Sequence, residues 1–164
     1  MASLLHLTAA RNAARIRRAG IAAASVSRTG VRGVYCSALL PSFTLSHQWA
    51  RELVQGRGRV LAAVHLRVPD DEPVTVGHYS GEGLRECAAA QAVALIAGLD
   101  DSRGWEIFLA RAVAAREVHA IRPLARPVGW RYFPGAHGRR PCTCLVCLGP
   151  GQYGARSIRR KYGD

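Results

Sequence analysis

One ten-residue segment alternates between two kinds of residue and limits the folds open to this chain. Its apolar side is Val60, Ala62, Val64, Leu66 and Val68. The intervening positions are Arg59, Leu61, Ala63, His65 and Arg67. A period of two places the apolar set on one face of a β-strand. The chain must therefore build a sheet with a buried face, and it must supply further strands to pair with this one.

Further strands and helices are predicted on both sides of this segment. The predicted strands cover 4–7, 31–36, 74–79, 105–109 and 117–124, and the predicted helices cover 9–19, 46–54 and 82–99. Strands outnumber helices and the two kinds follow each other in mixed order. This order predicts an α+β fold rather than a doubly wound parallel sheet. The turn 69–73 carries three acids, which suit either a solvated loop or a bound cation.

A short apolar strand with one histidine begins the chain. His6 lies within it, Thr8 is placed to cap the helix that follows, and Gly20 is placed to end that helix. A lone strand histidine is usually a buried structural residue. Alternatively, His6 belongs to a functional site whose other members lie further along the sequence.

The charge of the chain is strongly positive and unevenly placed. Its 164 residues carry a formal net charge of +12, and Lys161 is the single lysine among 23 basic residues. The tail between Glu117 and Asp164 contains no acid. This pattern predicts either a nucleic-acid partner for the basic C-terminal region or a solvated basic surface. The length fits one domain with an appendage, and we expect residues 1–125 to form a core and residues 126–164 an extension.

Localisation is predicted to be cytoplasmic. No segment has the length and apolarity of a membrane span, so no membrane partner is expected. The arginine-rich stretch 11–18 has the composition of a mitochondrial transit peptide, but the strand before it favours a folded element. Without a secretory signal, the five cysteines are expected to be reduced thiols.

Three of these cysteines gather in the tail. Cys142, Cys144 and Cys147 follow His137 in a segment rich in glycine and proline. Three thiolates and one imidazole form a closed ligand set for structural zinc. The spacing differs from a paired Cys-x-x-Cys knuckle, and free thiols or a redox pair remain alternatives.

Three short motifs together resemble the ADP-ribosyltransferases of the His-Tyr-Glu type. The first is Leu5-His6-Leu7-Thr8 with the helix after it, and the second is Gly33-Val34-Tyr35-Cys36-Ser37. The third is the strand Trp105–Leu109 and the strand that follows it. Their order and spacing are similar to those of poly-ADP-ribose polymerase cores and of bacterial toxins that ADP-ribosylate thymidine in DNA. The resemblance implies a split antiparallel sheet with short flanking helices.

The resemblance also implies roles for particular side chains. His6 and Thr8 would hold the adenosine-side ribose of NAD, and Tyr35 would stack against nicotinamide. Glu106 would bind the nicotinamide ribose and activate the acceptor. Arg11 and Ser37 complete the expected NAD-binding set, with Arg11 near the start of the first helix, where a phosphate can rest.

Elimination among the six glutamates also favours Glu106. Glu52 is placed in a helix, Glu72 in the acidic turn, and Glu82 and Glu86 at a helix start. Glu117 is expected at a solvated strand end. An ordinary half-exposed strand acid is the alternative interpretation of Glu106.

The sequence thus predicts an NAD-dependent ADP-ribosyltransferase that modifies nucleic acid, with a toxin or defence role suggested by the family. One alternative is a zinc-stabilised nucleic-acid-binding protein without catalysis. Another is an NAD-consuming enzyme similar to tRNA 2′-phosphotransferases, although their site signature is not found here. The acceptor atom, the oligomeric state and any antitoxin partner are not determined by the sequence.

Overall fold

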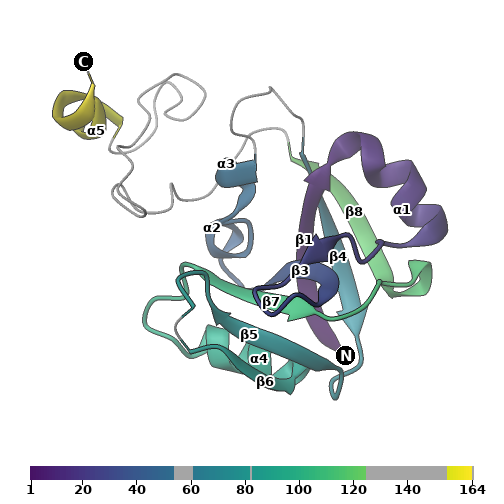
Figure 1. The fold of residues 1–164 in the computed structure, drawn as a ribbon. Coiled ribbons are helices and arrows are strands. Elements are labelled where there is room, and N and C mark those ends of the chain that lie inside the picture. Colours follow the sequence, from purple (N-terminus) through teal and green to yellow (C-terminus); the bar gives the residue numbers. More distant parts are fainter. Residues whose placement is uncertain (54–60, 82, 125–154, 164) are drawn as a thin grey trace.

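A computed structural model describes residues 1–53, 61–81, 83–124 and 155–163 (Figure 1). The strands are β1 (Ala2–Ala9), β2 (Ser25–Val26), β3 (Arg32–Ala38), β4 (Leu61–Val68), β5 (Pro73–His78), β6 (Arg85–Ala88), β7 (Trp105–Leu109) and β8 (Val118–Leu124). The helices are α1 (Ala13–Ala19), α2 (Phe43–Ser46), α3 (Ala50–Leu53), α4 (Ala89–Ala97) and α5 (Ala155–Tyr162). Two 3₁₀ turns, η1 (Ala10–Asn12) and η2 (Ala115–Glu117), precede α1 and β8.

The strands form one sheet in the order β6-β5-β7-β3-β1-β4-β8, with β2 paired to β3. Every strand pairing in the described part of the chain is antiparallel. Antiparallel strands with short separate helices confirm the predicted α+β class. None of the described helices is long and apolar enough to cross a membrane.

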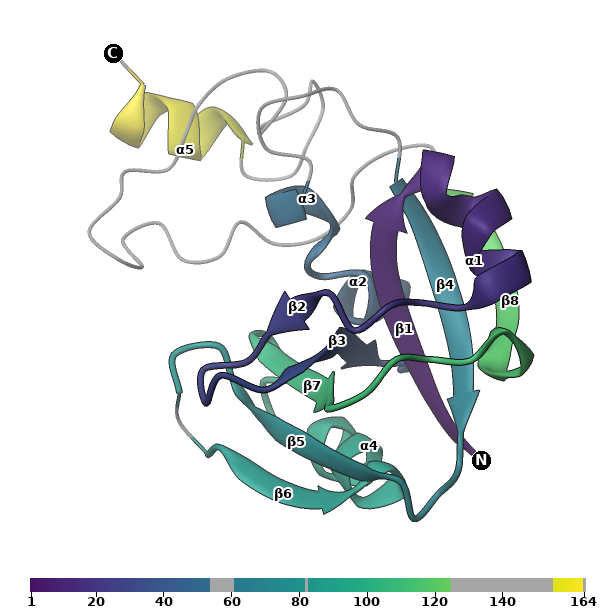
Figure 2. The same ribbon diagram turned by 45° about the vertical axis from the view of Figure 1, so that its right-hand side comes forward.

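The sheet opens between β1 and β3. These strands share only two partner pairs, Leu4 with Ala38 and Leu5 with Ser37. In contrast, β1 pairs with β4 over the whole of its length, from Ala2 to Ala9. Beyond Leu5 the strands β1, β4 and β8 therefore diverge from β3, β7, β5 and β6 (Figure 2).

The main hydrophobic core lies on the face of the sheet that α4 covers. Leu4, Val34 and Ile107 reach it from three neighbouring strands, and Ile96 reaches it from α4. Figure 1 shows α4 packed along β5 and β6, and α4 also contacts β1 and β3. Ile16 of α1 packs into the same core. A smaller cluster on the other face joins the apolar side chains of β1 and β4 to Ala50.

Three local predictions are wrong, and pairing between distant strands explains two of them. The third is the helix over 46–54: the chain instead forms the four-residue helices α2 and α3, and Ser42 caps α2. Thr8 does not cap a helix, because β1 continues to Ala9, and the Thr8 hydroxyl accepts a hydrogen bond from Asn12 Nδ2 at 2.9 Å. The helix predicted over 82–99 begins only at Ala89, because Arg85–Ala88 forms β6 against β5. Gly20 ends α1 as predicted, with a φ of 74° that favours glycine.

The acidic turn 69–73 is largely exposed, which agrees with a solvated loop, and its backbone also contacts the start of α4. Its backbone carbonyls at Asp70 and Glu72 accept hydrogen bonds from Ala90 and Ala89, at 3.0 and 2.8 Å. These two N–H groups belong to the first turn of α4, which has no intrahelical partners for them. The turn therefore fixes the start of α4 beneath the sheet.

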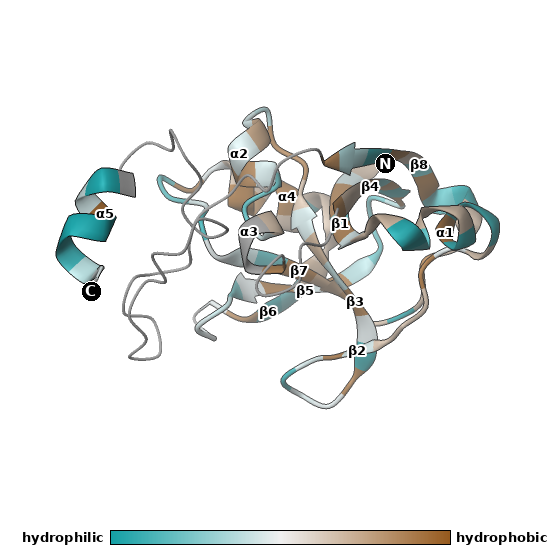
Figure 3. Ribbon diagram, turned by 90° about the horizontal axis from the view of Figure 1, so that it is seen from above, coloured by the Kyte–Doolittle hydropathy of each residue, from teal (hydrophilic) through white to brown (hydrophobic). Residues whose placement is uncertain are grey.

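The C-terminal helix α5 is polar. Its basic residues are Arg156, Arg159, Arg160 and Lys161. Figure 3 shows α5 as largely hydrophilic, in contrast to the apolar stretches of β1, β3 and β7. Most of the extension predicted over 126–164 lies outside the described residues, so the boundary after residue 125 stays a prediction.

Candidate functional site

His6 lies at the point where β1 and β3 separate. The last ladder pair joins Leu5 to Ser37, and the next link across the gap is a side chain: His6 Nδ1 lies 2.8 Å from the Tyr35 carbonyl oxygen. A carbonyl can only accept a hydrogen bond, so Nδ1 carries the proton and Nε2 of the neutral ring is an acceptor. Burial lowers the pKa of His6, which favours this neutral form.

A cavity of about 310 Å³ occupies the opening between the two parts of the sheet. Its polar lining comes from three strands that are distant in sequence: His6 from β1, Tyr35 and Ser37 from β3, and Glu106 from β7. Its apolar and remaining lining residues are Leu5, Leu7, Ser25, Cys36, Trp49 and Leu53. The structure thus gathers four of the predicted site residues around one space.

Tyr35 projects from β3 on the face away from the main core. Its ring lies 4.8 Å from the Phe108 ring, at an interplanar angle of 60°. Close approach of β3 to β7 requires glycine at position 33, because a Cβ there would lie 2.0 Å from the Leu109 carbonyl oxygen. Burial and the nearby Glu106 carboxylate raise the pKa of Tyr35, so its phenol is protonated at neutral pH.

Glu106 is a partly buried carboxylate on the same face. On β7 it alternates with Ile107, which points into the core, and it stands opposite Gly77 of β5. It forms no hydrogen bond or ion pair with any other described residue. Burial raises the pKa of Glu106, while the charge of Arg28 opposes this shift. An unpaired carboxylate in a cavity wall is available to a ligand.

A second cavity, of about 250 Å³, is also lined by Tyr35 and Glu106. The remaining lining residues are Ser27, Arg28, Thr29, Thr75, Gly77, Leu84, Arg85, Glu86 and Phe108. The residues Tyr35 and Glu106 are common to the linings of two cavities. The Glu106 carboxylate can therefore contact a ligand in either cavity.

The structure does not bring all the predicted residues to this site. Thr8 and Arg11 line neither cavity; Thr8 is occupied by Asn12, and Arg11 is exposed on η1. The predicted metal ligands His137, Cys142, Cys144 and Cys147 lie outside the described residues. Within the described part of the chain, no group of three or more His, Cys, Asp or Glu side chains is arranged to hold a metal ion.

Several lining residues were not anticipated from the sequence, among them Arg28, Trp49 and Ser25. Arg28 lies in the turn between β2 and β3, which the sequence shows only as a small, polar loop. Trp49, the residue before α3, and Ser25, in β2, line the first cavity. A possible signal in the sequence is the position of Arg28, seven residues before the tyrosine of the second motif.

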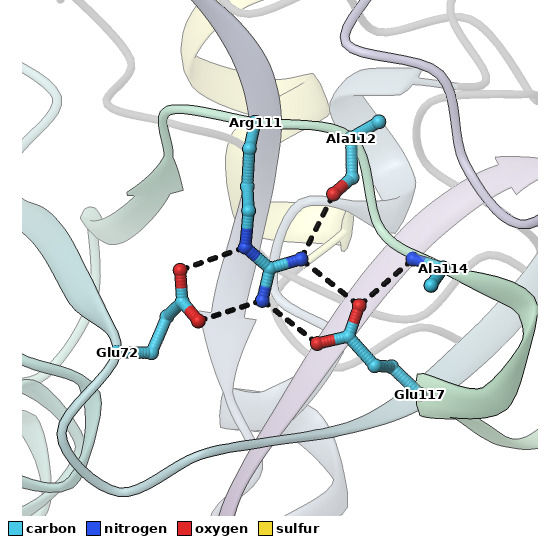
Figure 4. A network of polar contacts seen from close by, with 5 residues as sticks. All are labelled: Glu72, Arg111, Ala112, Ala114 and Glu117. Atoms are coloured by element: carbon cyan, nitrogen blue, oxygen red, sulfur yellow. Dashed lines mark hydrogen bonds and ion pairs between the residues drawn. The ribbon is translucent and has the colours of Figure 1, made fainter.

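Two other glutamates are occupied in a separate cluster around Arg111 (Figure 4). The guanidinium donates to both Glu72 oxygens at 2.7 Å and to the Glu117 oxygens at 2.7 and 2.9 Å. Glu117 was expected at a solvated end, which is wrong: its side chain is only 11% exposed. Glu117 also accepts a hydrogen bond from Ala114 N–H at 2.8 Å. The hydrogen bonds from Arg111 lower the pKa of Glu117.

Comparison with known proteins does not identify this site. No protein-family model, no curated protein and no solved structure matches the chain.

Proposed function

We propose that the protein is an NAD-dependent ADP-ribosyltransferase that modifies nucleic acid. The observation that carries the proposal is the shared cavity: His6, Tyr35 and Glu106 come from three separated sequence motifs and line one space. The separation of β1 from β3 supports it further, because the family that these motifs resemble has a split antiparallel sheet.

The side-chain chemistry suits NAD as a substrate. His6 Nε2 is an acceptor in a buried neutral ring, which fits a ribose hydroxyl as its donor. Tyr35 offers a ring face for nicotinamide, and Ser37 offers a hydroxyl close by. The Glu106 carboxylate then lies where the nicotinamide-bearing ribose would extend. Thr8 and Arg11 have no part in this assignment.

Glu106 accounts for the chemical step. Cleavage of the bond between ribose C1′ and the nicotinamide nitrogen passes through a species with oxocarbenium character, and the nicotinamide leaves with the bonding electrons. A carboxylate fixed beside C1′ stabilises the positive charge as it develops. Low solvent access around Glu106 strengthens this interaction.

Nucleic acid is the proposed acceptor because of charge. The chain carries +12, and α5 presents four basic side chains over eight residues. Phosphate backbones bind such surfaces by releasing counterions.

The zinc set His137, Cys142, Cys144 and Cys147 is proposed to hold the segment before α5. Metal analysis of the wild type and of Cys144→Ser tests it, and equal zinc content in the two would contradict it.

The function is tested by incubating the protein with NAD labelled in the adenosine part, in the presence of DNA or RNA. We expect label in the nucleic acid and release of free nicotinamide. Glu106→Gln should lower both on the order of 10³-fold, the effect typical of losing one preorganised electrostatic group. Asp100→Asn is the matched control, because Asp100 is an exposed acid outside both cavities.

Absence of both transfer and nicotinamide release would contradict the proposal. Binding of nucleic acid without consumption of NAD would instead favour a non-catalytic nucleic-acid-binding protein. Loss of a 2′-phosphate from a phosphorylated RNA would favour a phosphotransferase.

A further inference from the structure

Strands β4 and β8 carry a group of basic side chains: His65, Arg67, His119 and Arg122. In the β4–β8 ladder Arg122 stands opposite Ala63, two residues before His65, and Ala63 belongs to the smaller hydrophobic cluster. Arg122, His65 and Arg67 therefore share the face of the sheet against which α3 packs. A shift of register after His65 leaves His119 beside them without a ladder partner. Neither strand contains an acid.

These four side chains have no polar partner in the described part of the chain. None of them forms a hydrogen bond or an ion pair with another described residue. Arg67, His119 and Arg122 are exposed, and His65 is half-buried. Burial lowers the pKa of His65. Positive charge on Arg122, His47 and His119 lowers this pKa further, so a bound anion would relieve a repulsion that the fold leaves in place.

An exposed aromatic ring lies beside this group. Phe43, the first residue of α2, is 56% exposed. Its ring centroid lies 4.0 Å from that of His47, the buried histidine whose charge acts on His65. His47 Nδ1 donates a hydrogen bond to the Phe43 carbonyl oxygen at 2.8 Å, which fixes the two residues relative to each other. The surface therefore combines an exposed ring with unpaired cations.

This combination favours single-stranded nucleic acid over other anionic partners. Side chains on one face of a strand recur at about 7 Å, so the cations form a row rather than one pocket, and a row suits a chain of phosphates. An exposed ring gives an unpaired base a place to stack. A membrane-binding element instead presents a broad apolar face. The exposed residues of β4 and β8 are Arg67, His119, Arg122 and Pro123.

We propose that a single-stranded segment of nucleic acid binds the α2–β4–β8 surface, formed by Phe43, His65, Arg67, His119 and Arg122. An unpaired base stacks on the ring, and phosphates follow the basic side chains. The identity of the partner rests on the proposed function, and the surface goes beyond it, because these cations belong to the sheet and not to the C-terminal region. His65 stands opposite Leu5 in the β1–β4 ladder, and Leu5 lines the first cavity. Nucleic acid bound here is therefore held next to the candidate site.

Binding of labelled oligonucleotides in the absence of NAD tests the inference. The probes are short fluorescent DNA and RNA single strands of mixed sequence and the same strands with abasic sites throughout, measured by fluorescence anisotropy over a series of salt concentrations. Phe43→Ala should weaken binding of the normal strands at least about fivefold, since it removes one stacking contact, and should leave the abasic strands unchanged. Phe43→Trp keeps a ring and should bind as the wild type does. The side chain is exposed, so both variants are expected to fold.

A charge variant tests the contact to phosphates. Arg122→Gln should weaken binding of normal and abasic strands alike. It should also reduce the slope of log affinity against log salt concentration by about 0.7, the value for one phosphate contact to a single strand. Arg17→Gln is the matched control, because it removes the same charge from an exposed position of α1, which packs on the opposite face of the sheet through Ile16. This control should leave the slope unchanged.

Equal effects of Arg122→Gln and Arg17→Gln would overturn the inference, because net charge would then explain the binding. An effect of Phe43→Ala that is absent, or that is the same on normal and abasic strands, would overturn it as well. A third contrary result is binding to vesicles of phosphatidylcholine and phosphatidylserine that Arg122→Gln weakens, with neither strand affected. That result would identify a membrane surface as the partner.

The proposed function fails separately from this inference. Transfer of ADP-ribose to strands whose binding neither Phe43→Ala nor Arg122→Gln alters keeps the enzyme and removes the α2–β4–β8 surface. Strand binding that both variants weaken, without consumption of NAD, keeps the surface and removes the enzyme.

Discussion

Two regions of this molecule hold partly buried glutamates, and the two surroundings are opposite. Around Arg111, Glu72 and Glu117 share one guanidinium, and all four carboxylate oxygens accept hydrogen bonds from it. In the cavity wall, Glu106 has no hydrogen-bonding or ion-pair partner among the described residues. The pKa of Glu117 is lowered by its hydrogen bonds, and the pKa of Glu106 is raised by burial.

The two glutamates around Arg111 stabilise the fold, whereas Glu106 is placed to contact a ligand. Glu72 precedes β5 and Glu117 precedes β8, so their common arginine joins the two diverging parts of the sheet (Figures 2 and 4). Carboxylates held in this way by a guanidinium are fixed in position and contribute to the structure. Glu106 keeps its capacity for a ligand, and folding tolerates the cost of burying it unpaired. Such a cost is typical of functional positions.

Breaking the Arg111 cluster should have the largest effect on stability. Arg111→Met leaves two mostly buried carboxylates close together without a cation. We expect a loss of about 2–3 kcal/mol in the free energy of unfolding, below the full range for buried pairs because Arg111 is 35% exposed. Urea unfolding measures it, and Arg67→Met on the exposed side of β4 is the control. A loss under about 0.5 kcal/mol would show that the cluster does not join the two parts.

The second largest expected effect is a loss of stability at acidic pH, when the Arg111 cluster is weakened. The pKa of Glu117 is lower in the folded state than in the unfolded chain, so its contribution is present above the ordinary glutamate pKa and is lost as pH falls through the folded value. Wild-type stability should therefore fall between about pH 5 and pH 3 more steeply than that of Glu117→Gln. Parallel stability curves for the two proteins would contradict the pairing.

The contribution of Glu106 to stability should depend on pH in the opposite sense, and this effect should be the smallest of the three. Its folded pKa is raised, so its penalty is absent below the ordinary glutamate pKa and appears as pH rises through the folded value. Glu106→Gln should stabilise the protein at neutral pH by up to about 1 kcal/mol, and the gain should vanish near pH 4. A destabilised variant at neutral pH would mean that Glu106 has a structural partner after all.

Much of the sheet could be predicted from local patterns. The strand Trp105–Leu109 has the predicted bounds, and Gly20 ends the first helix, because alternation and glycine conformation are local properties. The strand Arg85–Ala88 was missed, since its residues continue an apolar helical pattern and only the pairing of Cys87 with Val74 makes them a strand. The capping role of Thr8 was also predicted wrongly, because pairing with β4 extends β1 to Ala9.

Sequence patterns alone predict an α+β chain with a histidine, a tyrosine and a glutamate on three separate strands. Which glutamates are paired depends on contacts between distant segments. Glu72 and Arg111 are 39 residues apart and meet only because β5 and β7 are neighbours in the sheet. The resemblance of the motifs predicts a split sheet, but the place of the split, after Leu5, appears only in the structure. Hydrogen bonds and cavities arise between segments, so the surroundings of Glu106 could not be known from its own strand.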